Sequence, residues 1–303
     1  RYRGSGGSWY GVLTYFRSTT NGASFDEERD IVTAAVAHHI YDVYAHAKAG
    51  KVVVGYKYQR NWEVVDSINV AVSNDNGVSF VHHQAALFHR DNGDQHPTLY
   101  DMQVDGDKIY LVYGDAYYYY GLRWARLFFG SSLNGGASFI TNRIDVPSNE
   151  NNNPKSTASN DYHYVPKIAF AGNRVYVVFN GVDFEGKFSV FLRRSLDSGA
   201  TFEPAINLSK SELPNKNIQD GHVTLAARGT KVYVVFTTTD EKIYLKRSMN
   251  SGASFYPIQE LTAPLHHSDE TEVGKNWWPV IKLDPSDTTG SKVHVVGYQL
   301  KYT

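Results

Sequence analysis

One turn sequence occurs five times in this chain, and this repeat constrains the possible folds more than any other feature of the sequence. The pattern is S-x-[D/N/T]-x-G-x-[S/T]-F, and it occurs at 18–25, 73–80, 132–139, 195–202 and 248–255. The short polar third residue can cap the backbone amides of a turn, and the glycine can adopt a positive φ. We therefore expect five equivalent turns in which the final Phe begins the next strand and packs inward. The third residues, which we expect to hold the turns together, are Thr20, Asp75, Asn134, Asp197 and Asn250.

A second pattern runs in step with the turns. Alternating stretches such as "KIYLVY" and "KVYVVF" begin at residues 51, 108, 174, 231 and 292. Their β-branched and aromatic residues are typical of strands. The unit recurs roughly every 60 residues. Joining the two chain ends leaves an interval of the same size, so five units close a ring and leave no room for a sixth.

Each unit contains four predicted strands, for example "YVPKIAFA", "RVYVVFNG", "FSVFLRRS" and "FEPAINLS" in one complete unit. Four-stranded units repeated radially are the blades of a β-propeller. The sequence therefore predicts an all-β fold, a five-bladed propeller that occupies 1–303 as a single domain. The predicted blades are approximately 38–90, 94–148, 160–210, 218–262, and a last blade made of 276–303 plus 8–36 that closes the ring between the two termini.

Composition excludes several classes of partner. The chain carries 30 Lys+Arg against 31 Asp+Glu and has no basic run, so we expect no nucleic acid as partner. The sequence has no stretch of about 18 apolar residues, so we expect no insertion into a membrane. The absence of cysteine excludes disulfides and thiolate metal sites. The opening "RYRGSGGSWY" lacks the apolar stretch of a signal peptide, and we expect a secreted or cell-surface protein whose signal peptide has been removed.

The repeated turn resembles the Asp-box, or bacterial neuraminidase repeat, of the sialidase-like propellers. The resemblance implies a turn on the outer rim that joins the third and fourth strands of a blade, and a carbohydrate partner. The chain departs from sialidases in three ways. Sialidases have six blades, whereas five are counted here. The chain also contains no Arg-Ile-Pro sequence, and no Arg opens a first strand. The resemblance therefore predicts the fold and a glycan ligand rather than sialidase activity. Two hypotheses stay open: a hydrolase or lyase acting on a glycan, and a non-catalytic lectin-like or structural surface module.

The segments that lead into the first strands would form the mouth of the central channel, where functional groups of a propeller are expected. Histidines recur there, and neutral imidazoles with carboxylates can act as general bases or bind a divalent metal. The alternative is that each histidine satisfies backbone groups at a strand end. The catalytic candidates are His96, His163, His222, Asp94 and Asp220, and the metal candidates are His38, His96, His163 and His222.

Aromatic and cationic residues near the same segments suit a sugar. Aromatic faces stack on the C–H faces of sugar rings, and arginines can grip an anionic sugar. The alternative use of the aromatic residues is packing between neighbouring blades. The ligand-binding candidates are Arg60, Trp62, Arg90, Tyr118, Tyr120, Trp277 and Trp278.

Overall fold

The computed structural model describes residues 2–3, 10–35, 38–60, 65–89, 97–119, 122–145, 165–182, 187–214, 218–240, 242–261 and 275–300. All regular structure in these residues is β-strand, as the sequence predicted. No helix long and apolar enough to cross a membrane occurs in the described part of the chain.

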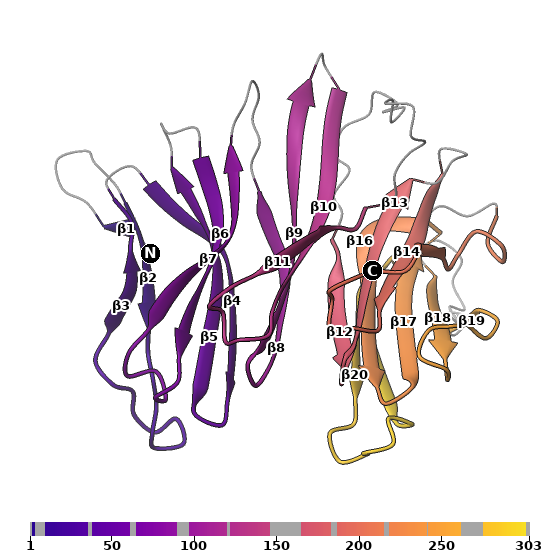
Figure 1. Cartoon of the computed structure of the whole chain (residues 1–303). Helices are drawn as coiled ribbons and strands as arrows, with labels where there is room; N and C mark the ends of the chain where they lie inside the picture. The colour runs from indigo at the N-terminus through magenta and orange to yellow at the C-terminus, as the bar shows by residue number, and fades with distance from the viewer. Residues whose placement is uncertain are drawn as a thin grey trace. The chain divides into compact units, whose positions relative to one another are not determined.

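The strands form antiparallel meanders in chain order, and Figure 1 shows the consecutive strands of each sheet lying side by side. Four of the sheets have four strands, which confirms the predicted four-stranded unit. Two shorter sheets stand at the chain ends, β1-β2-β3 and β20-β21.

The chain divides into two compact units, Arg1–Thr141 and Asn142–Thr303. The sheets of the first unit contain β1 (Tyr2–Arg3), β2 (Tyr10–Tyr15) and β3 (Arg29–Thr33); β4 (His38–Lys48), β5 (Lys51–Arg60), β6 (Val65–Ser73) and β7 (Val81–His89); and β8 (Thr98–Asp105), β9 (Lys108–Tyr119), β10 (Leu122–Ser132) and β11 (Ile140–Arg143), whose last residues pass into the second unit. Those of the second unit contain β12 (Lys167–Ala171), β13 (Arg174–Val182), β14 (Phe188–Ser195) and β15 (Ile206–Asn207); β16 (Ile218–Arg228), β17 (Lys231–Thr238), β18 (Ile243–Ser248) and β19 (Gln259–Glu260); and β20 (Lys275–Leu283) with β21 (Val293–Leu300).

Within the first unit, both faces of the β4–β7 sheet are buried. Val52 and Val54 of β5 pack against Leu13 and neighbouring residues of the β1–β3 sheet. The intervening Val53 belongs to a second cluster with Met102 and other apolar residues of β8 and β9. This alternation follows from the two-residue period of a strand, and it explains why the second strand of each unit is an unbroken apolar run.

The second unit repeats this packing. Val178 of β13 packs in one cluster with Val223 of β16 and Val234 of β17. Val235, the next residue of β17, lies in another cluster with Ile281 of β20. Each second strand therefore contributes alternate side chains to two cores.

The repeated turns have the geometry that the sequence predicted. Asp197 accepts hydrogen bonds from the backbone N–H of Thr201 (2.9 Å) and from the hydroxyls of Thr201 (2.6 Å) and Ser195 (2.7 Å). The backbone N–H of Gly199, at φ 86°, donates to the Ser195 hydroxyl at 2.8 Å. The same pattern recurs at the other turns, where the third residues are Thr20, Asp75, Asn134 and Asn250.

The final Phe of the turn differs from the expectation. The strands that follow the turns begin after this residue, at Val81, Ile140, Ile206 and Gln259. Phe80 does pack inward, edge-on against Tyr15 with ring centroids 5.3 Å apart. Phe25 is instead 63% exposed, so inward packing is wrong for this copy.

An arginine joins neighbouring sheets beside two of the turns. Arg194 binds Glu203 of its own sheet and donates through Nη1 to the carbonyl of Ser251 in the next turn, at 2.9 Å. In the first unit, Arg17 binds Asp26 and donates to the carbonyl of Asn76 at 3.1 Å. The two arginines occupy the same place in the repeat, and so do the carbonyls that accept from them.

The strands expected in the last blade are present at both chain ends, as β20–β21 and as β2–β3. They belong to different sheets and to different units. The closure of the ring, the count of five blades and the single domain therefore stay predictions.

Candidate functional site

Most of the predicted site residues lie outside the described residues or have undescribed side chains. Asp94, His96, Arg90, Trp62, Tyr120 and His163 fall between the described ranges. Arg60, Tyr118, Asp220, Trp277 and Trp278 lie in strands whose backbone alone is described there. The roles assigned to all of these residues stay predictions. The structure describes the side chains of two predicted site residues, His38 and His222, and they belong to different units.

The first strands of four sheets break their pairing at nearly the same place in the repeat. The register shifts lie between Tyr41 and Tyr44 in β4, Leu99 and Asp101 in β8, Ile218 and Val223 in β16, and Trp277 and Val280 in β20. Bulges of this kind re-aim side chains and are frequent next to active sites. Each bulge lies near the start of its strand, at the end where the sequence predicted a ligand site.

Asp42 stands out among the bulge residues of the first unit. It has φ 51°, a left-handed backbone conformation that non-glycine residues adopt at a cost. Its half-buried carboxylate reaches across to β8 and accepts the backbone N–H of Leu99 at 3.3 Å. Burial raises the pKa of Asp42, although Lys57 and the Leu99 amide partly oppose this. Burial therefore favours the protonated form of this carboxyl group more than solvent would.

Tyr44 and Asp101 complete the cluster around Asp42. The Tyr44 hydroxyl donates to the carbonyl of Tyr100, the bulged residue of β8, at 2.5 Å. Burial, together with the nearby Asp101 and Asp42, raises the pKa of Tyr44 to about 12. Asp101 is buried and accepts the backbone N–H of Met102 at 2.9 Å. Tyr44 is therefore a protonated donor and not an activated phenolate.

The β16 bulge of the second unit contains His222, which is 3% exposed. Ile218 and Val223, which border the bulge, are buried in the apolar core. Burial lowers the pKa of the His222 imidazole, which therefore stays neutral at neutral pH. Asn180 on β13 and Thr237 on β17 are buried at the matching place of their second strands. The second unit thus has buried polar side chains at the place in the repeat that the Asp42 cluster occupies in the first unit. Among the described side chains, none of these is a carboxylate.

The metal hypothesis receives no support from the described histidines. Nδ1 of His38 lies 3.0 Å from the hydroxyl of Tyr58, which occupies one of its two ring nitrogens. Among the described residues, no group of three or more His, Asp or Glu side chains could hold a metal ion. The predicted metal ligands His96 and His163 fall outside these residues.

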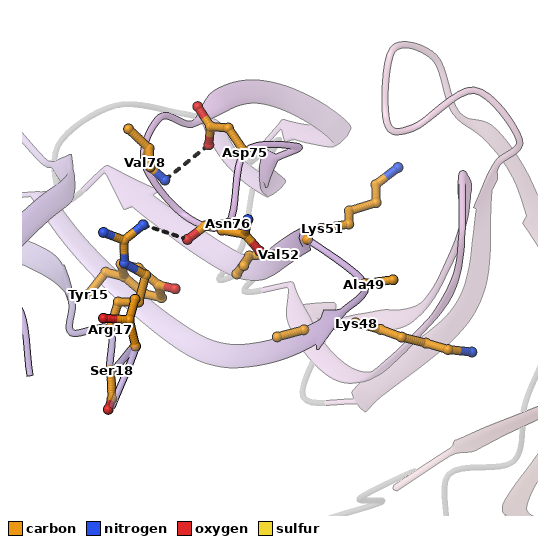
Figure 2. A pocket seen from close by; sticks show the side chains of 13 residues that line it. Tyr15, Arg17, Ser18, Lys48, Ala49, Lys51, Val52, Asp75, Asn76 and Val78 are labelled. Atoms are coloured by element: carbon orange, nitrogen blue, oxygen red, sulfur yellow. Dashed lines mark hydrogen bonds between the residues drawn. The ribbon is translucent and has the colours of Figure 1, made fainter. Parts of the chain in front are cut away.

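At the opposite end of the first unit, three turns border an open groove of about 620 Å³ (Figure 2). Three cations line it. Arg17 donates to the carbonyl of Asn76 (Figure 2), Nζ of Lys51 lies 2.6 Å from Asp107, and the exposed Lys48 lies 4.0 Å from Asp105. Each cation therefore has a partner, and the Asp42 cluster is the better candidate.

Asp42 was missed at the sequence level although its segment was singled out for its histidines. A signal was present: "YDV" at 41–43 and "YDM" at 100–102 each place an acid between an aromatic and an apolar residue of a first strand. An acid within a buried strand requires a partner or a function. The bulge that turns Asp42 toward β8 has no equivalent signal in the sequence.

No family model and no curated protein matches the chain. Among solved structures, it is similar to an α-L-arabinofuranosidase from Fusarium graminearum, with 11% identity, 97% of this chain and 88% of that chain covered, and a TM-score of 0.45. It is similar to a family 117 glycoside hydrolase from Zobellia galactanivorans, with 14% identity, 95% and 90% covered, and a TM-score of 0.43. It is also similar to a sialidase from Trypanosoma rangeli, with 14% identity and a TM-score of 0.43; 83% of this chain aligns with 40% of that one. These likenesses are too distant to say what this chain binds.

Proposed function

We propose that the chain is a five-bladed, sialidase-like β-propeller that engages a glycan at the bulged ends of its first strands and cleaves it with Asp42 as the proton donor. The single observation that carries the proposal is the state of Asp42, a half-buried carboxyl on a strained backbone at a bulge. Strain of this kind is retained where the surrounding structure uses it, and it clusters at active sites. A secreted or cell-surface location is part of the proposal.

The ring is supported by the repeat and by the meander of each sheet. The five turns and the five second strands recur in phase, and four sheets have the four strands of a blade. Among the described residues β20–β21 is a two-stranded sheet, whereas the repeated unit has four strands. The β2–β3 pair supplies the two that the repeat lacks.

Glycoside hydrolysis uses two carboxyl groups. One protonates the leaving glycosidic oxygen, and the other acts as the nucleophile or as the base that activates water. Asp42 fits the first role, since burial favours its protonated form. The predicted acid Asp94 is the candidate for the second role.

A glycan array followed by incubation of the best ligands tests the proposal. Asp42→Asn keeps the shape and the acceptor for the Leu99 amide but removes the transferable proton. We expect turnover to fall by about 10²- to 10⁴-fold with ligand affinity retained. Asp105→Asn, a change at the far end of β8, is the matched control and should leave turnover unchanged. Full turnover by Asp42→Asn would remove Asp42 from the mechanism.

A non-catalytic glycan-binding or surface-assembly module is the second candidate. It is favoured by the engagement of Tyr44 and Asp101 with main-chain groups, which is the behaviour of a structural polar layer. In that case the array shows binding without turnover for every ligand, and a chain that binds no glycan at all is left with the assembly role.

A further inference from the structure

Lys57 of β5 is a buried lysine. Only 6% of it is exposed, although lysine is among the residues least often buried. It pairs across the β4–β5 ladder with Tyr41, the residue before Asp42, and its Nζ lies 5.6 Å from the centre of the Tyr41 ring. The buried ammonium therefore lies directly beside the bulge.

The strands that pair with β5 or pack against it carry three acidic residues. Asp42 of β4 interacts with it electrostatically across the bulge. Asp66 of β6, 1% exposed, is two residues from Ile68, the cross-strand partner of Lys57, and so shares a sheet face with it. That face packs on β8, which carries the buried Asp101. Tyr44 and Tyr100 are the other titratable groups at Asp42, and Tyr44 stays protonated.

The repeat shows that this charge is not needed for the fold. The places equivalent to Lys57 hold Gly114, Asn180, Thr237 and Tyr298, none of which is a cation. The second strands that hold these residues form regular ladders. The other buried lysine among the described residues, Lys246 of β18, is paired with Glu212. A buried cation is expensive to keep unless it is paired, and the acid that interacts with Lys57 across the bulge is Asp42.

We propose that Lys57 is the positioning residue of the Asp42 site: its ammonium holds the Asp42 carboxyl group against the end of β8 and sets its charge, through the bulge and not by contact with the ligand. The inference rests on the proposed function for its purpose, but the coupling itself is a property of the ligand-free protein. The places equivalent to Lys57 in the other four units hold no cation, so the proposal applies to the β4–β7 sheet.

The coupling is measured by following the carbon-13 signal of the Asp42 carboxyl during a pH titration, with the signal identified by its loss in Asp42→Asn. In Lys57→Gln we expect the Asp42 midpoint to move to higher pH, because an opposing positive charge has been removed. In Lys57→Arg, which restores the charge, the midpoint should return toward that of the unchanged protein. An Asp42 midpoint that is the same in folded Lys57→Gln as in the unchanged protein overturns the proposal.

The reciprocal measurement keeps the proposal testable if Lys57→Gln does not fold. Asp42→Asn should lower the pH at which the ε-carbon signal of Lys57 titrates, since linkage is mutual. Asp107→Asn, which removes an exposed acid beside Lys51, is the matched control and should leave Lys57 unchanged. An unchanged Lys57 in Asp42→Asn overturns the coupling, whereas full turnover by the same variant overturns only the catalytic role of Asp42.

Discussion

Asp197 shows how much one side chain does in the repeated turn. Its carboxylate accepts three hydrogen bonds, which lower its pKa to about 2. Asn134 and Asn250 occupy the same place in other copies and accept the equivalent backbone N–H at 3.0 Å. The turn therefore requires an acceptor oxygen at this place. A negative charge on the acceptor is present in only some copies of the turn.

Asp197→Ala should lower the free energy of unfolding by about 1 kcal/mol, the usual cost of losing a side-chain cap. Asp197→Asn is the matched control and should cost less, since the chain itself uses Asn here. Because the folded pKa is depressed, the carboxylate's contribution is present above the ordinary Asp pKa and is lost as the pH falls toward 2. Urea unfolding at pH 7 and at acid pH tests both points; a pH-independent difference between the Asp197 protein and Asp197→Asn would contradict the second.

His222 also makes the free energy of unfolding fall as the pH is lowered, but the cause is a buried neutral imidazole and not a hydrogen-bonded carboxylate. Burial lowers its pKa, so the folded chain binds fewer protons there than the unfolded chain. This contribution to stability is complete above the ordinary histidine pKa of about 6.5 and declines as the pH falls below it. His222→Leu should flatten the melting temperature between neutral and mildly acid pH. His294→Gln, an exposed change on β21, should leave the slope as it is, and an equal slope in His222→Leu would count against the burial argument.

At the scale of elements, the arginine beside the turn is one of the side chains that connect one sheet to the next at that end. Arg194 has a side chain only 13% exposed, and its planar fork serves Glu203 and the Ser251 carbonyl together. It adds a polar contact to the apolar core that the two sheets share.

Arg194→Lys should therefore cost about 1 to 2 kcal/mol, because the ammonium cannot satisfy both partners. The exposed pair Lys242 and Glu260 supplies the control: Lys242→Ala should cost well under 1 kcal/mol. Equilibrium unfolding in urea measures both. Equal losses would mean that the inter-sheet bond contributes nothing.

The first strands show where prediction from sequence ends at this scale. Their existence, order and hairpin partners follow from apolar alternation and turn chemistry. The bulge at Asp42 does not, because a one-residue slip in a ladder depends on how the strand packs against β8. The site predicted from histidines is for this reason accompanied by an acid and a lysine that the pattern did not single out.

For the whole molecule, the repeat itself predicts how the last blade pairs. Val54 pairs with Ala71 across β5 and β6, and the equivalent residues at the two chain ends are Val295 and Phe16. If the blade closes in that register, Val295→Cys with Phe16→Cys should form a disulfide on mild oxidation, since paired strands bring Cα atoms to about 5.5 Å. The chain has no cysteine of its own, so any bond is the engineered one.

Val295→Cys with Tyr10→Cys is the control for that experiment. Tyr10 begins β2, so it lies roughly 20 Å along the strand from Phe16 and should not react. Mass spectrometry of non-reduced peptides gives the result. Absence of the first disulfide in a folded variant would contradict the closed ring of five blades.

By itself, the sequence determined the all-β class, the four-stranded unit and the chemistry of the five turns. Each of these is local: period-two alternation, a short polar acceptor and a glycine at positive φ act over a few residues, and neighbouring residues are enough to specify them. Only the tertiary structure decided that Asp42 leaves its strand at a bulge, that Lys57 is buried beside it and that His222 lies in the core. Burial and charge at these places depend on which sheet faces which, and a pattern along the chain carries no record of the facing sheet.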